Sequence, residues 1–252
     1  TADGTGKGKF TSTITGLTIG KTYYVRAYAA NKAGVAYGKA IAFIPNGEIK
    51  DIDGNVYHTV EIGNQTWLKE NLKTTRYRDG NPIPKVTDLS EWNNLTTAAY
   101  CEYDNDSVIS ATYGYLYNGN IVESTNICPE GFHIPTDEEW KTMEQSLGML
   151  AYELDNTDWR GPSVGLKLKE AGYEHWSSSN TGFNSSGFTA LPGGYRSAYA
   201  YEGKGVDGYW WTSSRASVST KHWYRKLSSS SSSVFRQNWV NKYGLSIRCV
   251  ND

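Results

Sequence analysis

The side chains best suited to covalent chemistry in this sequence are three cysteines, Cys101, Cys128 and Cys249. They are far apart in the chain, and none belongs to a CxxC pair or to a Cys/His spacing typical of zinc sites. Two interpretations stay open from the residues alone. Either all three are buried free thiols, or two of them form a disulfide and leave one unpaired, which would place the protein outside the cytosol.

The histidines and the acidic clusters do not form a catalytic pattern. The acidic run Asp137–Glu139 follows Thr136 and is interpreted as the capped start of a helix. The run Asp104–Asp106 is interpreted as a solvated turn rather than a cation site. None of the four histidines lies in a nucleophile elbow or an HExxH motif; they are His58, His133, His175 and His222. The sequence therefore predicts no catalytic residue.

One segment imitates the start of a calcium loop. Asp51, Asp53 and Asn55 have the spacing of calcium ligands, but Ile62 stands where the loop requires a bidentate glutamate. A hairpin turn at Asp53-Gly54 is the favoured interpretation, because Asp-Gly is a strong turn signal. No metal and no cofactor are predicted.

Composition excludes some classes of function and raises one question. The chain has 25 basic and 26 acidic residues, which excludes the broad basic surface of a nucleic-acid-binding protein. No stretch approaches the ~18 apolar residues of a membrane-spanning helix. The start lacks a signal-peptide pattern, so a mature or trimmed chain is expected. The 9 Trp and 19 Tyr against 6 Phe are either buried with hydrogen-bond partners or displayed at a surface.

Residues 1–46 are predicted to be entirely β. A strand is expected at Phe10–Ile14, a longer one at residues 22–31, a hairpin turn at Asn31–Gly34 and a returning strand at Gly38–Ile44. The run Tyr23-Tyr24-Val25-Arg26-Ala27-Tyr28-Ala29-x-Asn31 resembles the C-terminal half of a fibronectin type III domain. That resemblance implies that Tyr23 is a corner tyrosine bonded to the loop before it, and that the segment is a partial domain.

Residues 47–252 are predicted to be a second domain. Hairpins are expected at Asp51–Tyr57 and at Ile62–Trp67, the second with Asn64-Gln65 at its bend. Two helices are expected, from Thr136 to Gly148 and from Ser163 to Ala171. Short strands and long loops follow. They include a hairpin around the serine run 228–233 and a last strand over residues 244–250.

Several motifs in this second region resemble one family, the Fibrobacter succinogenes major paralogous domain. They are Gly63-x-Gln65-x-Trp67-Leu68-x-Glu70-Asn71-Leu72, Tyr113-Gly114-x-Leu116-Tyr117-Asn118, Cys128-Pro129-x-Gly131-Phe132-His133-Ile134-Pro135-Thr136, Gly187-Phe188-x-Ala190-Leu191-Pro192-Gly193-Gly194, Trp210-Trp211-x-Ser213-Ser214 and Ser246-x-Arg248-Cys249. The resemblance implies an α+β, C-type lectin-like fold near the sulfatase-modifying-factor branch, with two short helices and irregular antiparallel strands. It also implies a Cys128–Cys249 disulfide and leaves Cys101 as a buried thiol.

The resemblance favours a non-catalytic binding module at the cell surface or in the secreted fraction. Carbohydrate recognition without calcium is the first hypothesis, because aromatic rings stack on sugars and the calcium-lectin motifs are missing. A structural or adhesin component that binds protein partners is the alternative. A formylglycine-generating-type enzyme is a further alternative, but the late segment lacks the reactive cysteine that it needs. The candidate ligand-binding residues are Trp159, Trp176, Asn184, Tyr199, Tyr201, Trp223, Arg225 and Trp239.

These hypotheses also predict the setting of the protein. We expect a monomeric head of a larger exported protein, in the extracellular space or on the outer membrane, with an upstream lipid anchor as one mode of attachment. We expect a glycan or surface-protein ligand and no nucleic-acid partner. Four tryptophans lie in patterned helix or strand segments and are assigned to the scaffold: Trp67, Trp140, Trp210 and Trp211.

Overall fold

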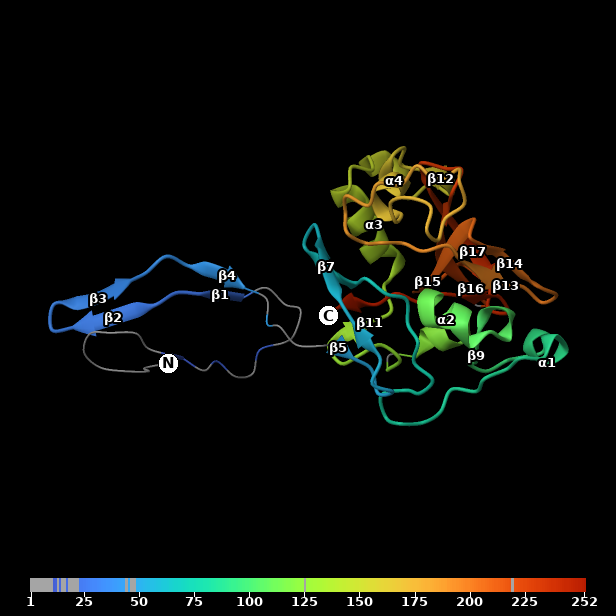
Figure 1. Cartoon of the computed structure of the whole chain (residues 1–252), viewed down its shortest axis with the longest axis horizontal. Coiled ribbons are helices and arrows are strands. Elements are labelled where there is room, and N and C mark those ends of the chain that lie inside the picture. Colours follow the sequence, from blue (N-terminus) through green and yellow to red (C-terminus); the bar gives the residue numbers. More distant parts are fainter. Residues whose placement is uncertain are drawn as a thin grey trace. The chain divides into compact units, whose positions relative to one another are not determined.

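A computed structural model of the chain describes residues 11, 12, 14, 17, 23–43, 45, 49–124, 126–218 and 220–252. The chain forms two compact units, Thr1–Glu48 and Ile49–Asp252. Each unit has its own sheets (Figure 1).

The smaller unit contains one long hairpin. Strand β1 (Tyr23–Val25) pairs with β4 (Ile41–Phe43), and β2 (Tyr28–Asn31) pairs with β3 (Gly34–Tyr37). The predicted turn is confirmed, since Asn31 lies opposite Gly34 and its side chain accepts a hydrogen bond from Ala33 N at 2.8 Å. The side chains of β2 and β3 are exposed.

The two arms of this hairpin are not the continuous strands that the sequence predicted. Val25 pairs with Ile41 and Tyr28 with Tyr37, so residues 26–27 oppose residues 38–40. The extra residue makes a bulge that interrupts both arms. The expected strand at Phe10–Ile14 and the loop at 18–22 that Tyr23 was expected to contact lie largely outside the described residues.

The larger unit is a mixed, sheet-rich fold with few helices. Its largest sheet has the order β12-β17-β16-β15-β13-β18-β10-β9, with β14 beside β13. The pairs are antiparallel except β13 with β15. The strands are β9 (Tyr100–Cys101), β10 (Leu116–Asn118), β12 (Asp158–Arg160), β13 (Gly193–Arg196), β14 (Tyr201–Lys204), β15 (Asp207–Arg215), β16 (Lys221–Ser228), β17 (Val234–Val240) and β18 (Gly244–Leu245).

A smaller sheet has the order β11-β19-β8-β7, and β5 and β6 form a separate pair. These strands are β5 (Ile49–Lys50), β6 (Val56–Tyr57), β7 (Thr59–Ile62), β8 (Gln65–Leu68), β11 (Phe132–His133) and β19 (Val250–Asn251). Both early hairpins are confirmed. The second bends one residue earlier than predicted, at Gly63-Asn64, because Gly63 takes a φ of 63° that favours glycine.

The expectation of two helices is wrong in number. The two predicted helices are present as α3 (Asp137–Ser146) and the shorter α4 (Val164–Leu168), and α1 (Leu89–Asn93) and α2 (Ser107–Tyr113) are additional. Three 3₁₀ turns complete the unit: η1 (Tyr103–Asn105), η2 (Ile121–Glu123) and η3 (Ala151–Glu153). The capping box of α3 is confirmed, with reciprocal bonds between Thr136 and Glu139. Helices α1 and α2 were not predicted, although each begins after an aspartate whose side chain accepts a hydrogen bond from the helix backbone.

The serine run forms the predicted hairpin between β16 and β17. The buried Lys169 holds this turn, since its Nζ donates to the carbonyls of Ser228 at 2.7 Å and Ser231 at 2.9 Å. The run is therefore an ordered part of the fold and not a linker.

The last segment is two short strands and not the single strand that was predicted. Strand β18 belongs to the nine-stranded sheet and β19 to the four-stranded sheet. Between them Cys249 forms the disulfide with Cys128 that the family resemblance implied. The buried Arg248 beside it donates to Asn71 Oδ1 and to the Phe188 carbonyl. The segment thus ties both sheets together.

One of the buried clusters is built around tryptophans. Trp140 of α3 has its ring 5.1 Å from Trp67, 5.7 Å from Phe188 and 6.3 Å from Trp210. All four rings are buried. Trp211, on the opposite face of β15, belongs to a second cluster. The four tryptophans assigned to the scaffold are therefore core residues.

We predict that Trp140→Ala lowers the free energy of unfolding by about 3–5 kcal/mol, because it leaves a cavity among closely packed rings. Chemical denaturation followed by circular dichroism measures this loss. Trp159→Ala is the control, since Trp159 is 42% exposed and should cost much less. A loss below about 1 kcal/mol for Trp140→Ala would contradict its assignment to the core.

We also predict that reduction of the Cys128–Cys249 bond lowers the free energy of unfolding by about 4–5 kcal/mol. The bond closes a loop with a sequence separation of 121, and the chain-entropy model gives that magnitude for such a loop. Denaturation with and without reductant measures it. Non-reducing mass spectrometry of the Cys101→Ala variant should still find Cys128 joined to Cys249. If both cysteines of the exported protein were free thiols, the predicted bond would be wrong.

Candidate functional site

Strands β15, β16 and β17 direct alternate side chains to the two faces of the large sheet. The register pairs Tyr209 with Lys226, Lys226 with Phe235, and Phe235 with Trp159 of β12. These four residues therefore share one face. The intervening Arg225 points to the opposite face, where it binds α3. The first face carries the candidate site.

Aromatic rings cover much of this face. Trp239 stacks on Tyr224, with ring centroids 4.6 Å apart, and on Tyr243, with ring centroids 4.1 Å apart. Tyr195 and Tyr209 contact the same indole at 5.2 Å and 5.6 Å. Trp239 is therefore packed against four tyrosine rings of the fold. This predicted ligand-binding residue instead anchors the aromatic cluster.

The exposed end of the cluster lies on β12, at the edge of the sheet. Trp159 is 42% exposed and rests edge-on against Phe235 at 5.1 Å. Lys226 Nζ lies 5.8 Å from the Trp159 ring centroid and 3.0 Å from Asp207 Oδ2. We name Trp159, Phe235, Lys226 and Asp207 the Trp159 patch. Of these four residues only Trp159 was predicted from the sequence, although the pairing of β16 with β17 could have indicated Phe235 and Lys226.

The charge of Asp207 has a further effect on its surroundings. Burial and the Asp207 charge both raise the pKa of Tyr209, whose hydroxyl donates to Asp207 at 3.3 Å. Burial, followed by a hydrogen bond with the Glu202 side chain, raises the pKa of Tyr195 in the same way. Both phenols therefore stay protonated and can donate hydrogen bonds beside the patch.

Two predicted ligand-binding residues lie on the opposite face of the sheet. Arg225 is fully buried and binds Asp137 and Glu144 of α3, each at 2.7 Å. Trp223 is covered by the guanidinium of Arg236, which lies 3.7 Å from its ring centroid. Arg225 is therefore a scaffold residue, because its burial excludes contact with a ligand.

Two other candidates stabilise loops. Trp176 is buried, and its indole donates to the Ala190 carbonyl at 2.9 Å. Asn184 has a φ of 50° and closes a local turn, since its side chain accepts from Thr189 N and donates to Thr189 Oγ1, both at 2.9 Å.

Tyr199 and Tyr201 belong to a different group. Tyr199 is 83% exposed. The ring of Tyr201 packs against Tyr103 at 5.3 Å, and its hydroxyl donates to Asn105 Oδ1 at 3.0 Å. Tyr201 is thus partnered within the fold, and Tyr199 offers a single exposed ring.

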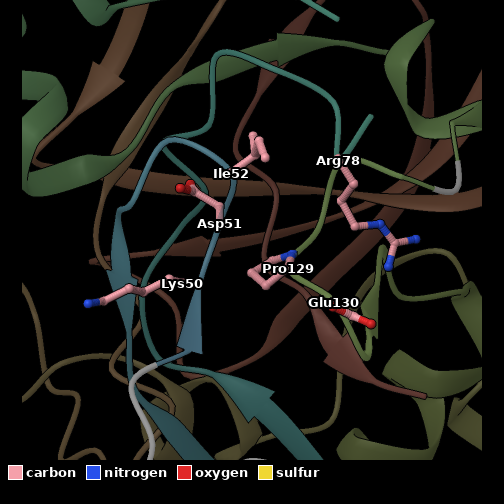
Figure 2. A pocket seen from close by; sticks show the side chains of 6 residues that line it. All are labelled: Lys50, Asp51, Ile52, Arg78, Pro129 and Glu130. Carbon is pink, nitrogen blue, oxygen red and sulfur yellow. The ribbon is translucent and has the colours of Figure 1, made fainter. Parts of the chain in front are cut away.

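A pocket of about 400 Å³ lies elsewhere on the larger unit (Figure 2). It is lined by Lys50, Asp51, Ile52, Arg78, Pro129 and Glu130. Figure 2 shows the charged ends of Lys50 and Arg78 on opposite sides, directed away from one another. The Asp51 carboxylate is occupied by the hairpin, where it accepts bonds from Asn55 N and the Tyr57 hydroxyl. The polar groups that line the pocket therefore do not converge on one point, whereas a specific ligand site requires such convergence.

Two of the cysteines are joined in a disulfide, the third is a buried thiol, and the histidines have polar partners. Burial raises the pKa of the Cys101 thiol, which disfavours the nucleophilic thiolate, and the other two cysteines are joined. Each histidine ring contacts a carboxylate or an amide: His58 with Glu70, His133 with Glu139 and Asp252, His175 with Glu170, and His222 with Asn241. A histidine that activates a nucleophile would, in addition to such an orienting partner, face a hydroxyl or a thiol.

Comparison with known proteins supports the family resemblance. The chain belongs to the family of the Fibrobacter succinogenes major domain, whose family model matches residues 60–251. No curated protein and no solved structure matched the chain. Within the described ranges, no helix is long and apolar enough to cross a membrane.

We predict that Arg225→Met lowers the free energy of unfolding by about 3–5 kcal/mol, because it leaves two buried carboxylates short of a partner. Denaturation at pH 7 measures this loss. Arg215→Met is the control: its ion pair with Glu123 is exposed and should contribute about 1 kcal/mol or less. Equal losses in the two variants would contradict the structural role of Arg225.

The same variant should reveal a dependence on pH. Burial alone would raise the pKa of Asp137, but Arg236 and Arg225 hold it well below its usual range. A lowered pKa in the folded state gives stabilisation that is present above about pH 4 and is lost as the pH falls further. The difference in stability between wild type and Arg225→Met should therefore shrink below about pH 4. A constant difference down to pH 2 would contradict it.

Proposed function

We propose that this protein is a non-catalytic, C-type lectin-like binding module that recognises carbohydrate at the Trp159 patch without calcium. The observation that carries the proposal is the exposed indole of Trp159, held against Phe235 beside the Lys226–Asp207 ion pair. An aromatic face next to fixed hydrogen-bonding groups is the combination that binds a sugar ring and orients it.

The roles of the individual groups follow from their chemistry. The indole face of Trp159 would contact the apolar C–H face of a pyranose ring. Lys226 would donate charge-assisted hydrogen bonds to sugar hydroxyls, and Asp207 would hold the Lys226 ammonium in position through their ion pair. Because the two charges are paired at 3.0 Å, the patch carries little net charge and suits a neutral ligand.

Two features support the lectin-like and exported parts of the proposal. The Cys128–Cys249 bond joins a residue shortly before α3 to one near the end of the described chain, which matches the long-range bridge of C-type lectin-like domains. Disulfides persist in oxidising compartments, so the bond favours a protein that is exported to the cell surface or beyond.

The enzymatic alternative has less support. A formylglycine-generating-type mechanism requires reactive cysteines, whereas burial raises the pKa of Cys101 and the remaining pair is joined in a disulfide. A structural or adhesin role would use the same patch for a protein partner, because Trp is also enriched in protein interfaces.

A glycan array probed with the whole chain tests the proposal. We expect one or more neutral glycans to bind, with affinity unchanged by EDTA and reduced about tenfold or more in Trp159→Ala. Tyr199→Ala is the matched control, since it removes an exposed ring outside the patch. Unfolding curves verify that both variants fold.

The possible results separate the hypotheses. If Trp159→Ala and wild type bind the glycan with equal affinity, the proposed location of the site at the Trp159 patch is wrong. If no glycan binds and the chain instead captures a surface protein in a Trp159-dependent manner, the carbohydrate proposal is wrong and the adhesin alternative is supported.

A further inference from the structure

A loop between α4 and β13 brings three potential metal ligands together. Glu170, Glu174 and His175 each offer one ligand atom, and these atoms lie within 4.8 Å of one another. His175 Nδ1 is 2.9 Å from both carboxylate oxygens of Glu170. Two atoms bound to one ion at about 2.0–2.1 Å stand roughly 2.9–3.4 Å apart for bond angles from 90° to tetrahedral. The spacing of His175 and Glu170 is thus already that of a coordinated pair.

The loop is fixed by contacts that do not involve the ligand atoms. Asn180 Nδ2 donates to the carbonyls of Glu170 at 2.9 Å and Gly172 at 2.8 Å. The buried Trp176 anchors the chain directly after His175. The His175 ring lies edge-on to Tyr113, with centroids 5.7 Å apart. An ion would therefore find most of the ligand geometry formed in advance, which reduces the entropic cost of binding.

The electrostatics of the loop also favour a cation. Within the described part of the chain, the ion pair of Glu170 is with His175, and no lysine or arginine lies within 4.0 Å of either glutamate. Two carboxylates in close proximity repel one another unless a positive charge offsets them. Burial, followed by the charge of Glu170, raises the pKa of the Tyr113 phenol.

The other His–carboxylate contacts differ in geometry. His133 also faces two carboxylates, but Glu139 contacts Nε2 and Asp252 contacts Nδ1. These two nitrogens point away from one another. An ion bound to one ring nitrogen of His133 therefore cannot also contact both the Glu139 and the Asp252 carboxylates. His58 has Glu70 alone. In the Glu170 loop one ligand atom from each glutamate lies within 4.8 Å of a His175 ring nitrogen and of the other glutamate's ligand atom.

We propose that Glu170, Glu174 and His175 bind a divalent first-row transition ion such as Zn²⁺. The imidazole nitrogen favours such ions over Ca²⁺ and Mg²⁺, which prefer oxygen ligands alone. The imidazole would bind the ion in its neutral form. With three protein ligands, a coordination position stays open to water or to a ligand group.

Isothermal titration calorimetry of the whole, tag-free chain with Zn²⁺ tests the proposal. We expect one site per chain, and visible absorption bands when Co²⁺ replaces Zn²⁺. Glu174→Gln should weaken Zn²⁺ binding about tenfold or more, and His175→Ala should abolish the stoichiometric site. Glu174 is exposed, so its variant should fold normally. His58→Ala removes a comparable His–Glu pair that has no third ligand and should bind Zn²⁺ as wild type does.

Each result has a definite meaning. No binding of Zn²⁺ by wild type at about 100 μM, far weaker than the submicromolar affinities of built sites, would overturn the proposal. Equal loss of binding in His58→Ala and His175→Ala would show adventitious histidine binding only, which also overturns it. The outcome is independent of the glycan hypothesis, because Trp159→Ala should leave the Zn²⁺ affinity unchanged.

Discussion

The fold of the larger unit depends on a buried ionic cluster between α3 and the large sheet. Arg225 of β16 bridges Asp137 and Glu144, Arg236 of β17 contacts Asp137, and Arg160 of β12 contacts Glu144. Removing these charges from water costs free energy. The ion pairs offset this cost only while each charged side chain keeps its partner. The cluster therefore fixes the position of α3 on three adjacent strands more specifically than apolar packing could.

The fixed position of α3 determines the two faces of the sheet. Arg225 and Arg236 point to the helix, so alternation along β16 and β17 directs Tyr224, Phe235 and Trp239 to the other face. The same placement brings Trp140 into the buried tryptophan cluster. A charged interface on one side thus produces an aromatic surface on the other, and the candidate site is a consequence of how the helix is held.

Local patterns predicted the parts of the fold whose signals lie within a few residues. The capping box before α3 and the turns of the early hairpins are examples, and both are present. The alternation of side chains along a strand does not show which face of the sheet a helix covers. Arg225 and Trp159 were therefore equally suitable candidates for ligand-binding residues. The break between β18 and β19 was also hidden, because Arg248 and Cys249 have the sequence of a strand while bonding to Asn71 and Cys128, far away in the chain.

The excess of tyrosine and tryptophan has a physical explanation in this arrangement. A loop-rich fold leaves many carbonyl groups inside, and polar-tipped rings can satisfy them while filling volume. Trp92, Trp176 and Trp211 each donate to a backbone carbonyl, which phenylalanine could not do. Most of the aromatic residues are therefore required by the scaffold. The exposed indole of Trp159 packs against Phe235 at the edge of the sheet, and the proposed carbohydrate site is therefore centred on it.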